Sequence, residues 1–103
     1  MYVMVIENYF DEGYLGNVRA KESISNYKTR YWGYSKEVNE EELSELITHS
    51  EIVPWSAVID LDKNEMLTNE EEFAIFNKYN SNKEIRLNDK WFFDQFNYNN
   101  KNA

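Results

Sequence analysis

The chain contains no cysteine and a single histidine, His49. The absence of cysteine excludes disulfides, thiolate zinc sites, iron–sulfur clusters and cysteine nucleophiles. A single histidine excludes a dyad of histidines and any metal site that takes several histidines from one chain. Proline occurs once, at Pro54, and glycine three times, so no Pro- or Gly-rich linker divides the 103 residues. A chain of this length is expected to form one domain.

Long hydrophobic runs are missing as well. The apolar segment at residues 1–6 has no basic leader and no small-residue cleavage site, so it does not resemble a signal peptide. No stretch approaches the ~20 apolar residues of a membrane span. We therefore expect a cytoplasmic protein without a membrane partner. No pattern points to a cofactor, and we expect none.

The segments rich in β-branched and aromatic residues predict short strands. At residues 55–61, Trp55, Ala57 and Ile59 alternate with Ser56 and Val58, as expected for a strand with two different faces. The remaining predicted strands lie at residues 2–6, 14–21 and 27–34, with a shorter one at residues 85–87.

Elsewhere in the chain, the apolar residues recur at every third or fourth position, which predicts helices. Asn39 followed by Glu42 is typical of a capping box, and Leu43, Leu46 and Ile47 form an apolar stripe at helical spacing. Thr68 or Asn69 can cap a second helix over residues 70–79, with Phe73, Phe76 and either Ile75 or Tyr79 facing inward, and Asn88 or Asp89 can cap a third one through Trp91, Phe92 and Phe96.

Together these elements predict a small α+β domain over residues 1–96. We expect an antiparallel sheet of about four strands with two to three helices packed on one face. The polar residues 97–103 are expected to form a frayed tail.

The negative charge is concentrated in one part of the chain. The net charge is -8, and residues 37–72 hold 12 acidic side chains against one basic side chain, Lys63. Two glutamate triplets, 40–42 and 70–72, open the first two predicted helices, where acids also complement the helix dipole. If these helices pack side by side, their N-terminal ends would form one acidic rim that attracts basic partners.

Residues 60–71 resemble an EF-hand calcium loop. Asp60, Asp62 and Asn64 stand at loop positions one, three and five, and Glu71 stands at the bidentate position twelve. Glu65 occupies the sixth position, where the turn favours glycine, and the preceding segment is strand-like rather than helical. A calcium-binding module therefore stays an alternative to a plain turn followed by a capped helix.

A second candidate surface combines aromatic and basic residues over positions 19–36. Bases stack on aromatic rings while cations hold phosphates, so this mixture would suit single-stranded nucleic acid. The same alternation is typical of an ordinary strand, and Tyr and Trp are equally common in protein interfaces. Direct contact with nucleic acid is not expected, although a local phosphate contact stays open.

Nothing in the chain forms a recognisable catalytic frame, so we expect no enzyme. In size and charge the chain is similar to small acidic inhibitors, such as phage anti-restriction and anti-CRISPR proteins and bacterial immunity proteins. We expect a DNA mimic that occludes a basic partner, for example a nuclease; an immunity protein or antitoxin is the alternative. The candidate partner-binding residues are Glu40, Glu41, Glu42, Glu45, Glu70, Glu71, Glu72, Trp32 and Tyr34.

Overall fold

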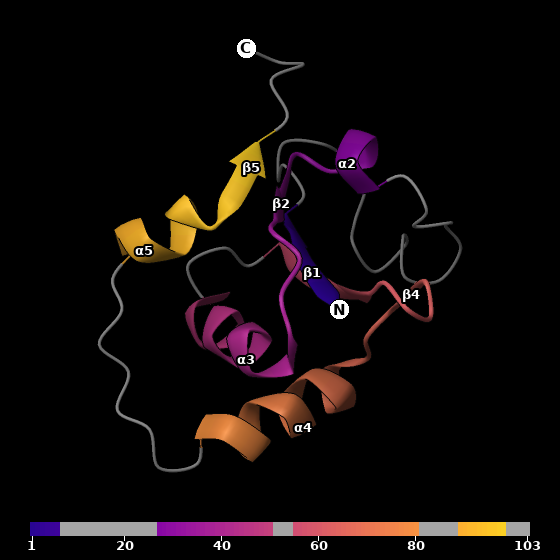
Figure 1. Cartoon of the computed structure of the whole chain (residues 1–103), viewed down its shortest axis with the longest axis vertical. Coiled ribbons are helices and arrows are strands. Elements are labelled where there is room, and N and C mark those ends of the chain that lie inside the picture. Colours follow the sequence, from indigo (N-terminus) through magenta and orange to yellow (C-terminus); the bar gives the residue numbers. More distant parts are fainter. Residues whose placement is uncertain (7–26, 51–54, 81–88, 99–103) are drawn as a thin grey trace.

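The computed structural model describes residues 1–6, 27–50, 55–80 and 89–98 (Figure 1). These residues form an α+β domain, which confirms the fold class expected from the sequence. In chain order the elements are β1 (Tyr2–Ile6), α2 (Tyr27–Arg30), β2 (Gly33–Ser35), α3 (Glu40–His49), β3 (Ser56–Asp60), β4 (Glu65–Met66), α4 (Asn69–Asn80), α5 (Asp89–Asp94) and β5 (Phe96–Tyr98).

The strands form one antiparallel sheet in the order β4-β3-β1-β2-β5. The longest ladder joins β1 to β3, with Val3 opposite Ile59. On its other side β1 pairs with β2, where Val5 lies opposite Tyr34. The strand that comes first in the chain is therefore the centre of the sheet, and the short strands β4 and β5 form its two edges.

Both faces of β1 are buried. Met4 and Ile6 belong to the cluster under α3 and α5, whereas Val3 and Val5 pack with Tyr27 of α2 on the opposite face. This explains why the strand is a continuous apolar run rather than an alternating one. The sheet is thus covered on both faces, because α2 packs on the face opposite α3 and α5.

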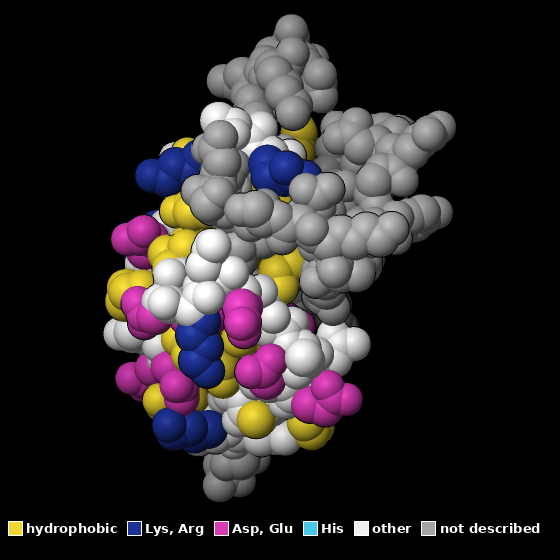
Figure 2. Space-filling model, turned by 90° about the vertical axis from the view of Figure 1, so that its right-hand side faces the viewer, with side chains coloured by type: hydrophobic (Ala, Val, Ile, Leu, Met, Phe, Trp, Pro, Cys, Tyr) yellow, Lys and Arg dark blue, Asp and Glu magenta, His cyan; other side chains and the backbone are white. Residues whose placement is uncertain are grey.

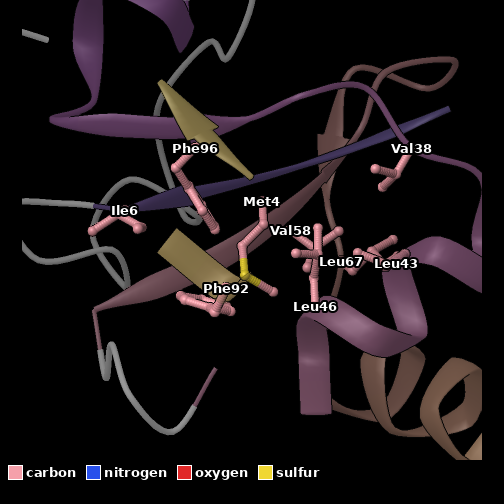
Figure 3. Packing of buried hydrophobic residues seen from close by; sticks show 9 residues of the cluster. All are labelled: Met4, Ile6, Val38, Leu43, Leu46, Val58, Leu67, Phe92 and Phe96. Carbon is pink, nitrogen blue, oxygen red and sulfur yellow. The ribbon is translucent and has the colours of Figure 1, made fainter. Parts of the chain in front are cut away.

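The larger core lies between the sheet and α3 (Figure 3). Met4 and Val58 point down from the central strands toward Leu43 and Leu46 of α3. Phe92 of α5 completes the layer and is fully buried. Burying each of these side chains is worth about 1.5–3 kcal/mol, so this cluster contributes much of the domain's stability.

The expectation of a strand over residues 27–34 is wrong at its beginning, since α2 occupies Tyr27–Arg30 and β2 begins at Gly33. Tyr27 and Tyr31 are both buried and are four residues apart. Residues at this spacing share a face in a strand and also in a helix, so the pattern fits both. The N–H of Tyr31 donates to the carbonyl of Tyr27, which closes the helical turn.

Near the C-terminus, the structure has a strand that the sequence did not predict. Phe96, expected in the last helix, belongs to β5, and Asn97 and Tyr98 pair with β2. Asn97 and Tyr98, which were expected in a frayed tail, therefore belong to this strand. The predicted strands at residues 14–21 and 85–87, like residues 99–103, lie outside the described residues.

Candidate functional site

The helices α3 and α4 pack against each other with their directions opposed. The Nζ of Lys78, near the end of α4, lies 2.8 Å from Oε1 of Glu40 in the first turn of α3. At the other end of the pair, Thr48 of α3 and Glu72 of α4 line the same groove. The two glutamate triplets therefore lie at opposite ends of the helix pair, and the expectation of one shared acidic rim is wrong.

The triplet of α3 combines structural and exposed carboxylates. The Oδ1 of Asn39 accepts from the Glu42 N–H at 2.8 Å, and Oε1 of Glu42 accepts from the Asn39 N–H at 3.0 Å, which is the predicted capping box. The hydrogen bond from Lys78 lowers the pKa of Glu40. Glu41 is exposed, so its carboxylate faces solvent at this end.

The triplet of α4 also combines one glutamate that closes a capping box with one that is exposed to solvent. Thr68 is the cap: its Oγ1 accepts from the Glu71 N–H at 3.2 Å, and Oε1 of Glu71 accepts from the Thr68 N–H at 2.8 Å. The backbone N–H of Thr68, followed by its hydroxyl, lowers the pKa of Glu71. Glu70 is exposed, and Glu72 is half-buried at the groove.

A further acidic group was not foreseen from the sequence. Burial raises the pKa of the Tyr2 hydroxyl, and the charges of Asp60, Glu40 and Asp62 raise it further. The backbone of Tyr2 also pairs with Asp60 at the end of β3 and with Val38 just before α3, so the β3–β4 turn and the first turn of α3 both lie near Tyr2. Only the fold brings these carboxylates together, because they come from separate segments of the chain.

The loop that resembles an EF-hand is a β-hairpin turn. The Oδ1 of Asp60 accepts from the N–H of Asp62 at 3.0 Å and from the N–H of Lys63 at 3.3 Å. Asn64 takes the left-handed conformation, with φ of 55°. Within the described ranges, no three His, Asp or Glu side chains come together as a metal site would require. Asp60, at the first loop position, instead stabilises the turn by accepting hydrogen bonds from two backbone N–H groups.

The two aromatic candidates are half-buried and lie on different faces of the sheet. The ring of Trp32 packs on Tyr98 with centroids 4.8 Å apart, beside the cluster under α3. Tyr34 contacts Tyr27 edge to face at 5.5 Å, in the cluster on the other face. The two aromatic candidates therefore belong to different packing clusters.

Among the described aromatic residues, Phe73 is the one that is mostly exposed. The sequence predicted that it faces inward, and this prediction is wrong, since 64% of its surface is accessible. The face of α4 toward the molecule carries Glu72, Ile75, Phe76 and Tyr79, all half-buried and at helical spacing. Phe73 lies about 100° around the helix from Glu72, at the border of this face. The spacing of Ile75 and Tyr79 was the signal that could have revealed it.

Phe73 borders an open groove between the end of α3 and the start of α4. Its volume is about 490 Å³. The lining is partly apolar and partly polar, and its only described charge is a carboxylate. The lining residues are Ile47, Thr48, Ser50, Asn69, Glu72, Phe73 and Phe76.

Side-chain charges of both signs are visible on the molecular surface. On the face shown in Figure 2, acidic side chains are scattered among Lys, Arg and apolar side chains instead of forming one continuous patch. Lys28, near Tyr27, and Arg30 are exposed on α2, away from the α3–α4 pair. The charge is therefore uneven along the fold, with acids on the helix pair and the hairpin.

His49, at the end of α3, is buried. It is 8% exposed, and its ring centroid lies 5.5 Å from that of Trp91 and 6.3 Å from that of Phe92. Among the described residues, its buried Nε2 has no hydrogen-bond partner. The imidazole therefore serves mainly to pack α3 against α5.

The comparisons with known proteins give no match. No protein-family model matches the chain, and neither the curated proteins nor the solved structures contain a significant match. In the part of the chain that the structure describes, no helix is long and apolar enough to cross a membrane.

Proposed function

We propose that this chain is a small acidic, non-enzymatic binding protein that inhibits a basic, nucleic-acid-handling protein by covering its binding surface. The observation that carries the proposal is the concentration of exposed carboxylates on α3, α4 and the β3–β4 turn. In the described part of residues 37–72, Lys63 is the single basic side chain among 11 acidic ones.

Helix capping accounts for only part of these carboxylates. Glu42 and Glu71 close capping boxes, and Glu40 pairs with Lys78. Glu41 and Glu70 are exposed and take no part in these interactions. Both stand in the first turn of a helix, where the helix dipole stabilises a carboxylate. Their charges remain in solvent, where they can attract a partner of opposite charge.

The mechanism would be electrostatic and steric. Carboxylates would stand where phosphates stand on the partner's usual ligand, and the bulk of the domain would exclude that ligand. Charge complementarity of this kind speeds association and makes it sensitive to salt. The proposed setting is the cytoplasm, where a phage anti-defence protein of the anti-CRISPR or anti-restriction type would meet such a partner.

The test is capture of a host protein by the immobilised chain, followed by measurement of that protein's affinity for DNA. The variant E41K/E70K should lose the partner, because it reverses one exposed charge at each end of the helix pair. The control E37K/D94K makes the same change in net charge at other exposed positions and should retain it. If both variants bind as the wild type does, or if the captured protein still binds DNA, the proposal fails.

A further inference from the structure

The groove between α3 and α4 has the anatomy of a small docking site. Its volume of about 490 Å³ lies in the range of ligand pockets, from ~300 to ~1,000 Å³. Ile47, Phe73 and Phe76 supply apolar surface, and Thr48 and Asn69 supply polar groups. An apolar centre with a polar border is the usual arrangement of protein interfaces.

The exposure of Phe73 is the second observation. Of the large hydrophobic side chains described, only Met1 and Phe73 are classed as exposed. A single exposed apolar residue needs no explanation by itself. Here, however, the exposed ring forms part of the groove, so a ligand that fills the groove would also cover it. Buried aromatic residues of this kind often dominate the binding energy of an interface.

The charge around the groove determines the chemistry of the ligand. Glu72 lines it, and Glu70 and Glu71 precede it in the same helix turn. The N-terminal dipole of α4 contributes only about half a positive charge, which three carboxylates outweigh. Lys63 is close enough to Glu71 to help lower the pKa of that carboxyl, and within the described residues that line the groove and open α4 the charges are carboxylates. A ligand with phosphates is therefore disfavoured, and a cationic one is favoured.

We infer that this groove binds a basic amphipathic segment of the partner protein, with one bulky apolar side chain in the groove and flanking Lys or Arg on Glu70 and Glu72. The inference rests on the proposed function, since it specifies how the partner is held. It adds a short-range apolar contact to the long-range attraction of the acidic helices.

The probe is a fluorescent helical peptide with Leu at every third or fourth position and Lys on the opposite face, with a second peptide in which Ala replaces every Leu. The wild-type chain should bind the Lys/Leu peptide at least tenfold more tightly than the Lys/Ala peptide. In NMR spectra, the Lys/Leu peptide should shift the amides of residues 47–50 and 69–76. Absence of these shifts at millimolar peptide would overturn the inference.

One variant removes the exposed ring, and a matched double variant moves the ring without changing the amino-acid composition. F73A should weaken binding of the Lys/Leu peptide about tenfold or more, as truncation of an interface anchor does. The double variant F73A/A74F should be equally weak, because Ala74 is exposed but lies about 100° further around the helix. If either variant binds as the wild type does, the groove is not the docking site.

Two further results separate this inference from its alternatives. E37K changes an exposed acidic residue outside α3 and α4 and should leave peptide binding unchanged. If E41K/E70K abolishes capture of the host partner while F73A does not, the proposed function stands and the inference fails. If the chain alone forms a dimer that F73A dissociates, as measured by sedimentation, a second copy occupies the groove and the inference also fails.

Discussion

Lys78 and Glu40 connect the end of one helix to the beginning of another. Their side chains meet at 2.8 Å, with 63% of the lysine and 33% of the glutamate side chain accessible. This contact is possible because α3 and α4 run in opposite directions. It also places a cation beside the first glutamate triplet, so this end of the helix pair is less negative than its sequence indicates.

The first prediction concerns this ion pair and pH. The pKa of Glu40 is lowered from its ordinary value near 4.5, so the pair stabilises fully above that value. The stabilisation is lost as the pH falls through the lowered pKa. The pKa of Lys78 is raised above 10.5, so the opposite loss occurs only as the pH rises through that raised value.

K78Q should therefore flatten the dependence of stability on pH in the acidic range, with a decrease of at most a few degrees in Tm at neutral pH, as expected for an exposed pair. Thermal unfolding followed by circular dichroism across this range is the measurement. K36Q, which removes an exposed lysine outside α3 and α4, is the control and should behave as the wild type does. An equal loss of stability in wild type and K78Q on acidification would contradict the assignment.

The second prediction concerns the two helix caps. N39A should lower the free energy of unfolding by about 1 kcal/mol, and T68A by a similar amount, because each leaves a backbone N–H of the first turn without its acceptor. N39D and T68S keep an acceptor oxygen and should remain close to the wild type. Urea unfolding measures the difference. A T68A variant as stable as T68S would show that Thr68 is not the cap of α4.

The third prediction compares two phenylalanines. F92A should lower the free energy of unfolding by about 3–5 kcal/mol, because it opens a cavity at a fully buried position. F73A should change it by less than about 0.5 kcal/mol, since that ring is mostly in solvent. The free energies of unfolding of both variants can be measured by urea denaturation. A strongly destabilised F73A would mean that the ring is covered in solution.

The fourth prediction concerns the β3–β4 turn. D60A should cost about 1–2 kcal/mol, because two backbone N–H groups lose the carboxylate oxygen that accepts from them. D60N retains an acceptor and should lose less. Millimolar calcium should leave the Tm of the wild type unchanged, since a ligand that binds the folded state would raise it. A rise in Tm that D60N abolishes would favour the calcium-binding alternative.

The sequence predicted the structure correctly where local preferences and packing in the folded domain favour the same conformation. Asn39 and Glu42 cap α3 as predicted, and Ala57 and Ile59 face away from Val58 as the alternation indicated. At residues 27–31 the local pattern was ambiguous, because tyrosines four residues apart fit a strand and a helix alike. The pairing of β5 with β2 depends on contacts between distant segments, which no local signal encodes.

The candidate site was predictable as a set of residues but not as an arrangement. The exposed acids Glu41 and Glu70 follow directly from the helix patterns. Their separation does not, because it depends on the opposed direction of α3 and α4. The prediction for Phe73 was wrong for a related reason. The sequence of α4 is compatible with two overlapping apolar faces, one that includes Phe73 and one that includes Ile75 and Tyr79. In the structure the second face packs toward α3.

The central position of β1 has a consequence for synthesis. This strand is made before β3, yet Val3 pairs with Ile59, which is made much later. Until β3 has left the ribosome, β1 is an apolar strand with one open edge, because only β2 is already made to pair with its other edge. Such segments are prone to pair with neighbouring chains. The speed of translation through residues 7–60 should therefore influence how much of the protein is recovered folded rather than aggregated.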